Sequence, residues 1–364
     1  MTDAAKLIRA HIRDMEAYQP VYPFEVLAQQ LGRDPAEIVK LNANENPYGP
    51  DPAALAALQD LEYAHIYPDP ESRLLRAALA KQLDLPIENL MIGAGADELI
   101  DLIMRLFLDP GDVLLNCPPT FGMYAFGAGV NNACLVEVPR KPNFSLDMEG
   151  IELAVAQHKP KLLFLASPNN PDGGVLPQEA LDRILAMPVA VVVDEAYIQF
   201  ADPGSSRLQA VFDHQNLIVL QTFSKWAGLA GMRVGYGVFP EELMPYLWKI
   251  KQPYNVSVAG AAAALASLEN IDALQENVCK LVTERQRLFE MLEEIPYLRP
   301  YPSQTNFILC QVISRPATDL KQALERAGIL VRYFNKPGLR DHIRISVGTP
   351  AQSNALLAAL AAME

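Results

Sequence analysis

Short apolar runs alternate with helix-length segments through the middle of the chain, from about residue 90 to 240. The predicted strands are 90–92, 113–117, 162–166, 189–193, 217–220 and 234–239. Strands that alternate with helices in this way form mainly parallel sheets, with helices packed on both faces. We therefore predict an α/β fold with a mainly parallel central sheet covered by helices.

The pattern changes after residue 250. Apolar residues recur at helical spacing between 274 and 292, which predicts one long amphipathic helix. Strand candidates (306–312, 329–332 and 343–347) then alternate with predicted helices (316–327 and 350–363). A chain of 364 residues suits two domains. We predict a large domain over 41–250, a smaller α/β domain over 251–364, and an N-terminal segment, 1–40, that packs with the smaller domain.

Composition excludes several classes of partner. The net charge is −13 without long runs of one sign, which argues against nucleic acid or an anionic membrane. The N-terminus lacks the signal-peptide pattern, and the longest apolar run, 258–268, is shorter than the roughly 20 residues of a membrane span. Four cysteines without paired spacing indicate a reducing compartment, so we expect a cytoplasmic protein. The five histidines lack ligand spacing, and we expect no metal site.

Polar segments rich in Gly and Pro follow five of the predicted strands. They are GAGADE (93–98), CPPTFGMY (117–124), SPNNPDGG (167–174), DEAY (194–197) and TFSK (222–225). In parallel sheets, ligands bind beyond the carboxyl ends of the strands. We expect these segments to face one crevice that contains an active site.

Lys225 carries the strongest chemical signal. Its amine could form a Schiff base with an aldehyde cofactor, while Thr222, Ser224 and Arg233 nearby could bind a phosphate. Alone, Lys225 would more often be a surface lysine. The flanking hydroxyls and the guanidinium favour the cofactor.

The DEAY segment adds complementary groups. Asp194 follows five apolar residues and could pair with a pyridinium nitrogen, and Tyr197 could donate to a ring oxygen. Taken alone, Asp194 is better explained as a buried salt bridge or helix cap, since an unpaired buried carboxylate is costly. Together with Lys225, it predicts pyridoxal 5′-phosphate (PLP).

Other groups at the strand exits have ordinary structural alternatives. The backbone amides of Ala96 and Asp97 could bind the phosphate at a helix N-terminus, or simply form a strand–helix turn. Asn170 could donate to the ring oxygen, or only shape a tight turn. Phe121 could stack on the pyridine ring, or be a core aromatic residue.

Two arginines belong to apolar strand candidates. Arg332 is the last residue of 329–332, and Arg344 lies within 343–347. A partly buried Arg332 or Arg344 requires an anionic partner. That partner is either a substrate carboxylate or phosphate, or a residue in an interdomain salt bridge.

Eight motifs, taken in order, resemble the fold-type I PLP-dependent aminotransferases, and among them the histidinol-phosphate aminotransferases. They are LNANENPYGP (41–50), YPDP (67–70), GADE (95–98), PPTFGMY (118–124), SPNNP (167–171), DEAY (194–197), SKWAGLAGMRVGY (224–236) and IRISVGT (343–349). The resemblance extends from about Tyr18 to the C-terminus. It implies the fold-type I transferase fold and PLP as the cofactor.

The resemblance also implies roles for single residues. Lys225 would be the Schiff-base lysine and proton shuttle, and Asp194 would pair with the pyridine nitrogen. The ring oxygen would be bound by Tyr197 and Asn170. The phosphate would be bound by Thr222, Ser224, Arg233 and the amides of Ala96 and Asp97. Tyr67 would reach the same phosphate from the partner subunit of a homodimer.

Substrate contacts follow from the same resemblance. Arg344 would bind the carboxylate of glutamate, while Tyr18 and Arg332 match positions that contact a phosphorylated amino substrate. The chain departs from the family at Phe121, where many relatives have tyrosine, and at Asp172, where threonine is usual. Both would affect fine substrate preference. Trp226 follows the lysine where small residues are common.

The implied reaction takes a small-molecule amino donor and a keto-acid acceptor. It transfers the amino group of histidinol phosphate to 2-oxoglutarate, giving imidazole-acetol phosphate and glutamate, in histidine biosynthesis. An aromatic amino acid aminotransferase or a threonine-phosphate decarboxylase would share every cofactor contact. A regulator built on the same fold would need a basic DNA-binding module, which a charge of −13 disfavours.

Overall fold

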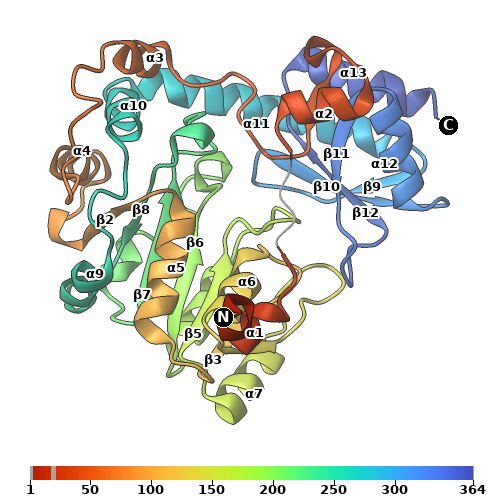
Figure 1. The fold of residues 1–364 in the computed structure, drawn as a ribbon. Helices are drawn as coiled ribbons and strands as arrows, with labels where there is room; N and C mark the ends of the chain where they lie inside the picture. The colour runs from red at the N-terminus through yellow and green to blue at the C-terminus, as the bar shows by residue number, and fades with distance from the viewer. Residues whose placement is uncertain (1–2, 18–21, 364) are drawn as a thin grey trace.

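The computed structural model describes residues 3–17 and 22–363, which form two sheets (Figure 1). The larger sheet has seven strands in the order β2-β8-β7-β6-β5-β3-β4. The smaller sheet has five strands in the order β1-β11-β12-β10-β9. Helices pack on both sheets, as the alternating pattern predicted.

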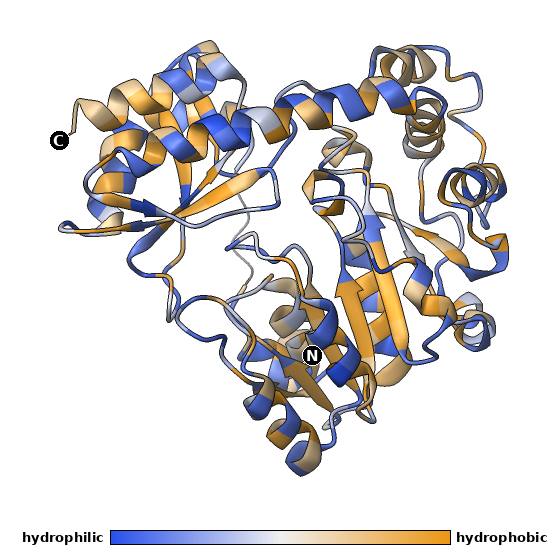
Figure 2. Ribbon diagram, turned by 180° about the vertical axis from the view of Figure 1, so that it is seen from behind, coloured by the Kyte–Doolittle hydropathy of each residue, from blue (hydrophilic) through white to orange (hydrophobic). Residues whose placement is uncertain are grey.

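The larger sheet is mainly parallel, which confirms the predicted fold class. Its strands are β2 (Leu90–Gly93), β3 (Val113–Asn116), β4 (Cys134–Glu137), β5 (Leu162–Ala166), β6 (Ala190–Asp194), β7 (Leu217–Thr222) and β8 (Gly235–Val238). Strand β8 alone runs antiparallel, to both β2 and β7. Every residue of β5 and β7 is buried, because helices cover both faces. Figure 2 shows the hydrophobic residues concentrated on these strands.

Two groups of helices cover the two faces of the larger sheet. Helices α5 (Ala96–Phe107), α6 (Met123–Val130) and α9 (Met244–Ile250) share a core with Val192 and Ile218. The opposite core contains Val191 and Val219 together with residues of several helices. Among these helices are α4 (Arg73–Leu83), α7 (Met148–His158), α8 (Gln178–Leu185) and α10 (Val258–Glu269). Successive side chains of a strand point to opposite faces, so one apolar strand supplies both cores.

The smaller sheet is mostly antiparallel. Its strands are β1 (Val39–Leu41), β9 (Leu298–Pro300), β10 (Phe307–Val312), β11 (Ile329–Tyr333) and β12 (His342–Ser346). Its core is shared with the long helix α11 (Ile271–Glu293), α12 (Ala317–Arg326) and α13 (Pro350–Ala361). The long amphipathic helix and the three strands predicted after residue 300 are confirmed.

Several packing contacts lie near the expected domain boundaries. Helix α2 (Phe24–Leu31) and β1 pack with the smaller sheet, whereas α1 (Ala10–Arg13) contacts α6 of the larger one. Helix α10 lies beyond the expected boundary at 251, yet it packs on α3 (Pro52–Gln59) and α4. Its buried alanines belong to the core of the larger sheet, a contact that local pattern does not encode. The exact division into domains stays a prediction.

Strand β4 is the one strand of the larger sheet that the pattern did not predict. It lies at the sheet edge, and three of its four residues are exposed, so it lacks a buried apolar run. Across residues 3–17 and 22–363, no helix combines the length and apolarity needed to cross a bilayer.

Candidate active site

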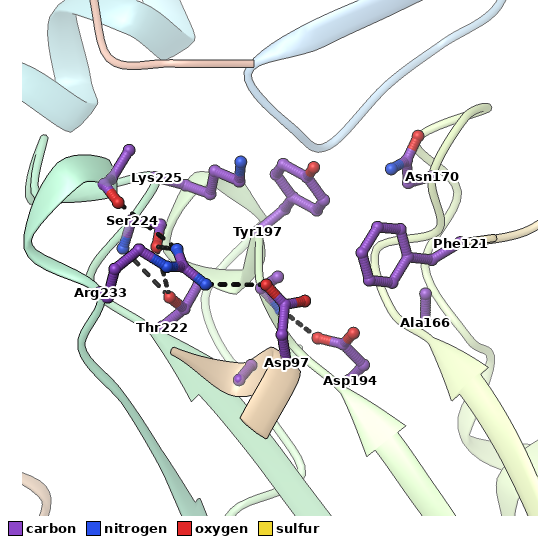
Figure 3. A pocket seen from close by; sticks show the side chains of 13 residues that line it. Asp97, Phe121, Ala166, Asn170, Asp194, Tyr197, Thr222, Ser224, Lys225 and Arg233 are labelled. Atoms are coloured by element: carbon purple, nitrogen blue, oxygen red, sulfur yellow. Dashed lines mark hydrogen bonds and ion pairs between the residues drawn. The ribbon is translucent and has the colours of Figure 1, made fainter. Parts of the chain in front are cut away.

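One pocket opens at the carboxyl ends of β5, β6 and β7, beside the N-terminus of α5 (Figure 3). Every residue expected to contact PLP from within one chain lines it. The lining residues are Ala96, Asp97, Phe121, Ala166, Asn170, Asp194, Ala196, Tyr197, Thr222, Ser224, Lys225, Ala230 and Arg233. Sequence reasoning missed the alanines 166, 196 and 230, because a small apolar side chain carries no chemical signal.

Lys225 projects into this pocket from the turn after β7. Its Nζ lies 5.9 Å from the centroid of the Tyr197 ring. The turn is anchored by its neighbours, since Phe223 and Trp226 are buried and stack with their ring centroids 5.6 Å apart. Trp226, the large residue where small ones are common, therefore packs in the core beside the lysine.

Hydroxyl, guanidinium and amide donors gather on one side of the pocket. The Thr222 hydroxyl donates to Ser224 Oγ at 2.9 Å, and Arg233 Nη2 donates to Asp97 Oδ2 at 2.8 Å. Helix α5 begins with Ala96 and Asp97, and among the described residues no side chain caps it. Its first backbone amides can therefore donate hydrogen bonds to an anion, as the N-termini of helices often do.

Two glycines let these donors come together. A Cβ on Gly95 would lie 2.5 Å from Arg233 Nη2, and one on Gly235 would lie 2.5 Å from the Ala96 amide nitrogen. Gly95 also has φ of 82°, in the left-handed region. Close approach of β8 to the start of α5 thus depends on the missing side chains.

Asp194 lies at the base of the pocket and is only 4% exposed. Its Oδ2 accepts a hydrogen bond from the Tyr124 hydroxyl at 2.8 Å, and its Oδ1 accepts one from the Ala196 amide at 3.1 Å. Burial raises the pKa of Asp194 to about 6, and the Tyr124 hydrogen bond opposes that rise. A cation bound beside the carboxylate would lower this pKa, which suits a pyridinium partner.

The opposite side of the pocket is formed by Phe121 and Asn170, and it meets the smaller sheet (Figure 3). Arg344 Nη1 donates to Asn170 Oδ1 at 2.5 Å, and Arg344 Nη2 donates to the Asn42 carbonyl at 3.2 Å. Its guanidinium carbon lies 5.1 Å from the centroid of Phe307. Arg344 therefore contacts a lining residue of the pocket, although it is not itself among the lining residues in the described part of the chain.

Two of the expected residues do not line this pocket, and a third falls outside the described residues. Arg332 is half-buried and pairs in register with Arg344, so both side chains lie on one face of the smaller sheet. Tyr67 is 79% exposed and stacks on Tyr254, away from the pocket of its own chain. Tyr18 lies outside the described residues.

The structure adds Asn44, which the residue-by-residue argument missed. Its Nδ2 donates to the Tyr197 hydroxyl at 3.0 Å, and its Oδ1 accepts from Ser346 Oγ at 3.0 Å. Asn306, which precedes β10 of the smaller sheet, donates to its carbonyl at 2.9 Å. Asn44 therefore joins Tyr197 to the smaller sheet. The only signal for it was its place in the motif LNANENPYGP.

Asp172, one of the departures from the family pattern, is hydrogen-bonded within its own turn. It is buried and accepts hydrogen bonds from Asn169 Nδ2 and from the Gly174 amide. Asn169 in turn accepts one from Thr120 at 2.8 Å. Asn169 thus joins this turn to the loop that contains Thr120, and Asp172 is not among the pocket-lining residues in the described part of the chain. The effect of this residue on substrate preference stays a prediction.

The donor set in this pocket fits PLP. The pocket is lined by a lysine amine, a buried carboxylate and the Phe121 ring, which could cover an aromatic ligand. The first amides of α5, which no side chain caps among the described residues, form an anion site on one side of the pocket. An aldehyde, a pyridine nitrogen and a phosphate are the groups these donors match.

Comparisons with known proteins agree with this geometry. The sequence pattern of the family "Aminotransferase class I and II" matches residues 36–360. Histidinol-phosphate aminotransferase 1 of Arabidopsis thaliana, named as chloroplastic, is 53% identical over 361 residues, which cover 99% of this chain and 86% of that protein. The histidinol-phosphate aminotransferase of Roseiflexus castenholzii is 50% identical over 360 residues, covering 96% of each protein.

A solved structure shares the whole fold. The crystal structure of histidinol-phosphate aminotransferase from Sinorhizobium meliloti in complex with PLP has a TM-score of 0.89 and 30% sequence identity, covering 98% of both chains. Family, relatives and fold lead to one conclusion. The chain belongs to the class I and II aminotransferase family and is a PLP-dependent aminotransferase.

Proposed function

We propose that this enzyme transfers the amino group of histidinol phosphate to 2-oxoglutarate, giving imidazole-acetol phosphate and glutamate, a step of histidine biosynthesis. The observation that supports this substrate is a second cationic region. Arg344 and Arg332 lie on one face of the smaller sheet, apart from the donors around Thr222, Ser224 and Arg233. Relatives that share half of their residues with this chain carry the name of the same activity.

We also propose a role for each group in the pocket. When bound, PLP supplies an electron-withdrawing ring that stabilises negative charge at the substrate Cα. Lys225 Nζ would take the proton from that Cα, and Asp194 would hold the proton of the ring nitrogen. Tyr197 and Asn170 would bind the ring oxygen, and Phe121 would cover the ring.

The phosphate of PLP would use donors on one side of the pocket. These are the hydroxyls of Thr222 and Ser224, the Arg233 guanidinium, and the first amides of α5. Arg344 is only 6% exposed, and a substrate phosphate or carboxylate would offer it charge-assisted hydrogen bonds. Histidinol phosphate has no α-carboxylate, so its phosphate could use both Arg344 and Arg332, while glutamate could use Arg344 alone.

A panel of half-reactions tests the substrate. The PLP form of the enzyme is mixed with histidinol phosphate, phenylalanine, tyrosine or threonine phosphate, and the loss of the PLP absorbance is followed. We expect the largest kcat/KM for histidinol phosphate. A preference for phenylalanine would identify an aromatic aminotransferase instead, and release of CO₂ from threonine phosphate would identify a decarboxylase.

A variant tests the second cationic region. Arg332→Ala should raise the KM for histidinol phosphate much more than the KM for glutamate. Arg340→Ala, which removes an exposed arginine of the same region of the chain, is the control. Equal effects of Arg332→Ala on both substrates would contradict the proposed division of the anions.

We propose that the enzyme acts as a homodimer in which Tyr67 reaches the phosphate in the partner subunit. The support is a segment of exposed apolar side chains, namely Tyr63, Ile66, Tyr67 and Leu74, next to an exposed Tyr254. Large exposed apolar groups in one segment favour a covering partner. A cytoplasmic location stays a prediction.

A further inference from the structure

We propose that Tyr124 is a positioning residue of the transamination, which holds Asp194 in the orientation and ionisation state that the cofactor's ring nitrogen needs. This proposal rests on the role proposed above for Asp194. Tyr124 lies outside the pocket lining, on α6, and reaches the carboxylate from behind.

The hydrogen bonds of Asp194 leave it little freedom. Tyr124 donates to Oδ2 at 2.8 Å, and the Ala196 amide donates to Oδ1 at 3.1 Å. Each carboxylate oxygen therefore has one fixed donor inside the protein, and each keeps acceptor capacity for a further donor. Because Asp194 also lines the pocket, a proton on a ring nitrogen could use that remaining capacity.

Packing holds the Tyr124 ring in place. The ring is fully buried and stacks on Phe164, with centroids 4.9 Å apart and an interplanar angle of 20°. Its edge meets Phe121 at 5.6 Å and 85°. Phe121 lines the pocket, so Tyr124 supports the proposed ring cover as well as the carboxylate below it.

The charges around Asp194 make the Tyr124 hydroxyl important. Burial raises the pKa of Asp194 most, and Asp97 on α5 raises it further. Donation from Tyr124 and from the Ala196 amide, together with the charge of Lys225 after β7, lowers it. The pKa of Tyr124 itself is raised well above its ordinary value by burial and by Asp194, so the phenol keeps its proton and remains a donor. Tyr197, the other phenol near this group, also raises the pKa of Tyr124.

Loss of the Tyr124 hydroxyl should therefore change where the proton between the ring nitrogen and Asp194 lies. Without that donor the Asp194 carboxylate binds a proton more readily, and a shared proton shifts from the ring nitrogen towards Asp194. A neutral ring withdraws fewer electrons, so the chemical step should slow while substrate binding changes little.

The test uses the full-length enzyme with its PLP exchanged for 4′-deoxypyridoxine 5′-phosphate, labelled with ¹⁵N in the ring. This probe lacks the aldehyde, so its binding does not depend on Lys225 chemistry. The ¹⁵N chemical shift reports whether the proton lies on the ring nitrogen. In Tyr124→Phe we expect a smaller protonated fraction at pH 7.5, about ten-fold weaker binding of the probe, and a lower kcat for the PLP enzyme at similar KM.

Two comparisons make the test specific. Tyr236→Phe removes an equally buried hydroxyl, which donates to Gln221 at 2.6 Å, and it should leave the ¹⁵N shift unchanged. In an Asp194→Asn background, the carboxylate that Tyr124 positions is gone. Adding Tyr124→Phe there should change both the protonated fraction of the ring nitrogen and the affinity for the probe by less than two-fold. Any general loss of stability would appear in both backgrounds.

The outcomes separate this proposal from the proposed function. Equal effects of Tyr124→Phe with and without Asp194 would mean that Tyr124 is merely structural, and would overturn the proposal alone. A ring nitrogen that is equally protonated in wild type and Asp194→Asn would overturn the proposed role of Asp194, and with it the role of Tyr124.

Discussion

Two adjacent carboxyl groups at the end of β6 are both buried but have different surroundings. Asp194 lines the pocket, whereas Glu195 accepts hydrogen bonds from Ser206 Oγ, the Arg207 amide and Gln221 Nε2. Burial raises the pKa of Glu195 to about 7, although those hydrogen bonds oppose the rise. Of these two neighbouring residues, Asp194 therefore faces the pocket, whereas Glu195 is hydrogen-bonded to other parts of the protein.

The raised pKa of Glu195 predicts a pH-dependent stability. The folded protein holds a proton that the unfolded chain releases near pH 4.5, so this contribution is complete below that pH and is lost as the pH rises through about 7. Glu195→Gln cannot titrate. From pH 5 to pH 8, the free energy of unfolding of the cofactor-free wild type should fall by more than that of the variant, by on the order of 1–3 kcal/mol.

Denaturant unfolding of both proteins at the two pH values measures this difference. Glu294→Gln changes an exposed carboxyl and should behave like wild type. The assignment fails if Glu195→Gln keeps the full pH dependence.

Lys225 is the residue on which covalent attachment depends. Borohydride reduction of the PLP enzyme should place the cofactor on the peptide that contains Lys225, as read by mass spectrometry. Lys225→Ala should lose this label and reduce transamination by at least about a thousand-fold, since it removes both the attachment point and the base. Lys249→Ala removes an exposed lysine and should do neither. A label on Lys251 or any other lysine would refute the assignment.

At the scale of elements, the anion site depends on the contact between β8 and the start of α5. Neither element forms the site alone. The first amides of α5 form an anion site only together with Thr222, at the end of β7, and with Arg233, which precedes β8. The contact between Gly235 and the Ala96 amide sets how closely the two elements approach.

Gly235→Ala should therefore weaken the binding of PLP. The added Cβ would lie 2.5 Å from the backbone nitrogen of Ala96, so the start of α5 must shift. Overpacking of this kind costs about 1–3 kcal/mol, which corresponds to a dissociation constant raised by about five-fold to a hundred-fold. Fluorescence titration of the cofactor-free enzyme with PLP measures it.

Gly231→Ala is the matched control. A Cβ at Gly231 meets no described atom within 4 Å, so PLP binding should stay as in wild type. Similar dissociation constants for the two glycine variants would show that the β8–α5 contact does not limit the site.

At the scale of the molecule, the pocket lies where the two sheets meet. Asn44 links Tyr197 to Ser346, and Arg344 of the smaller sheet donates to Asn170 of the larger one. A substrate that engages Arg344 would therefore contact both parts of the chain. The proposed dimer adds a further element, since Tyr67 does not reach the pocket of its own chain among the described residues.

Hybrid dimers test whether Tyr67 acts across the interface. Lys225→Ala and Tyr67→Phe subunits with different tags are co-expressed, and the mixed dimer is purified. If Tyr67 acts in the partner site, one of the two sites combines a native Lys225 with a native Tyr67. The hybrid should then have about half the activity of wild type and exceed both parent dimers. A hybrid with half the activity of the Tyr67→Phe dimer would mean that Tyr67 acts within its own chain.

The sequence by itself determined the central strands, the mainly parallel sheet and the residues around the pocket. Strands buried on both faces are continuous apolar runs, and the polar segments that follow them lie at one edge of a parallel sheet. Lys225, Asp194 and Thr222 could therefore be placed together before any contact was known. These residues predicted the cofactor, and the ordered motifs extended the prediction to the aminotransferase family.

Only the tertiary structure decided which segments meet. The edge strand β4 has no buried apolar run, α1 and α10 pack on helices of the larger sheet, and Asp172 accepts hydrogen bonds within its own loop. Tyr124 and Asn44 matter through partners that lie 70 and 153 residues away. Such contacts depend on how whole elements pack, which periodicity and local motifs do not specify, and they set the orientation and charge of the groups that the sequence had identified.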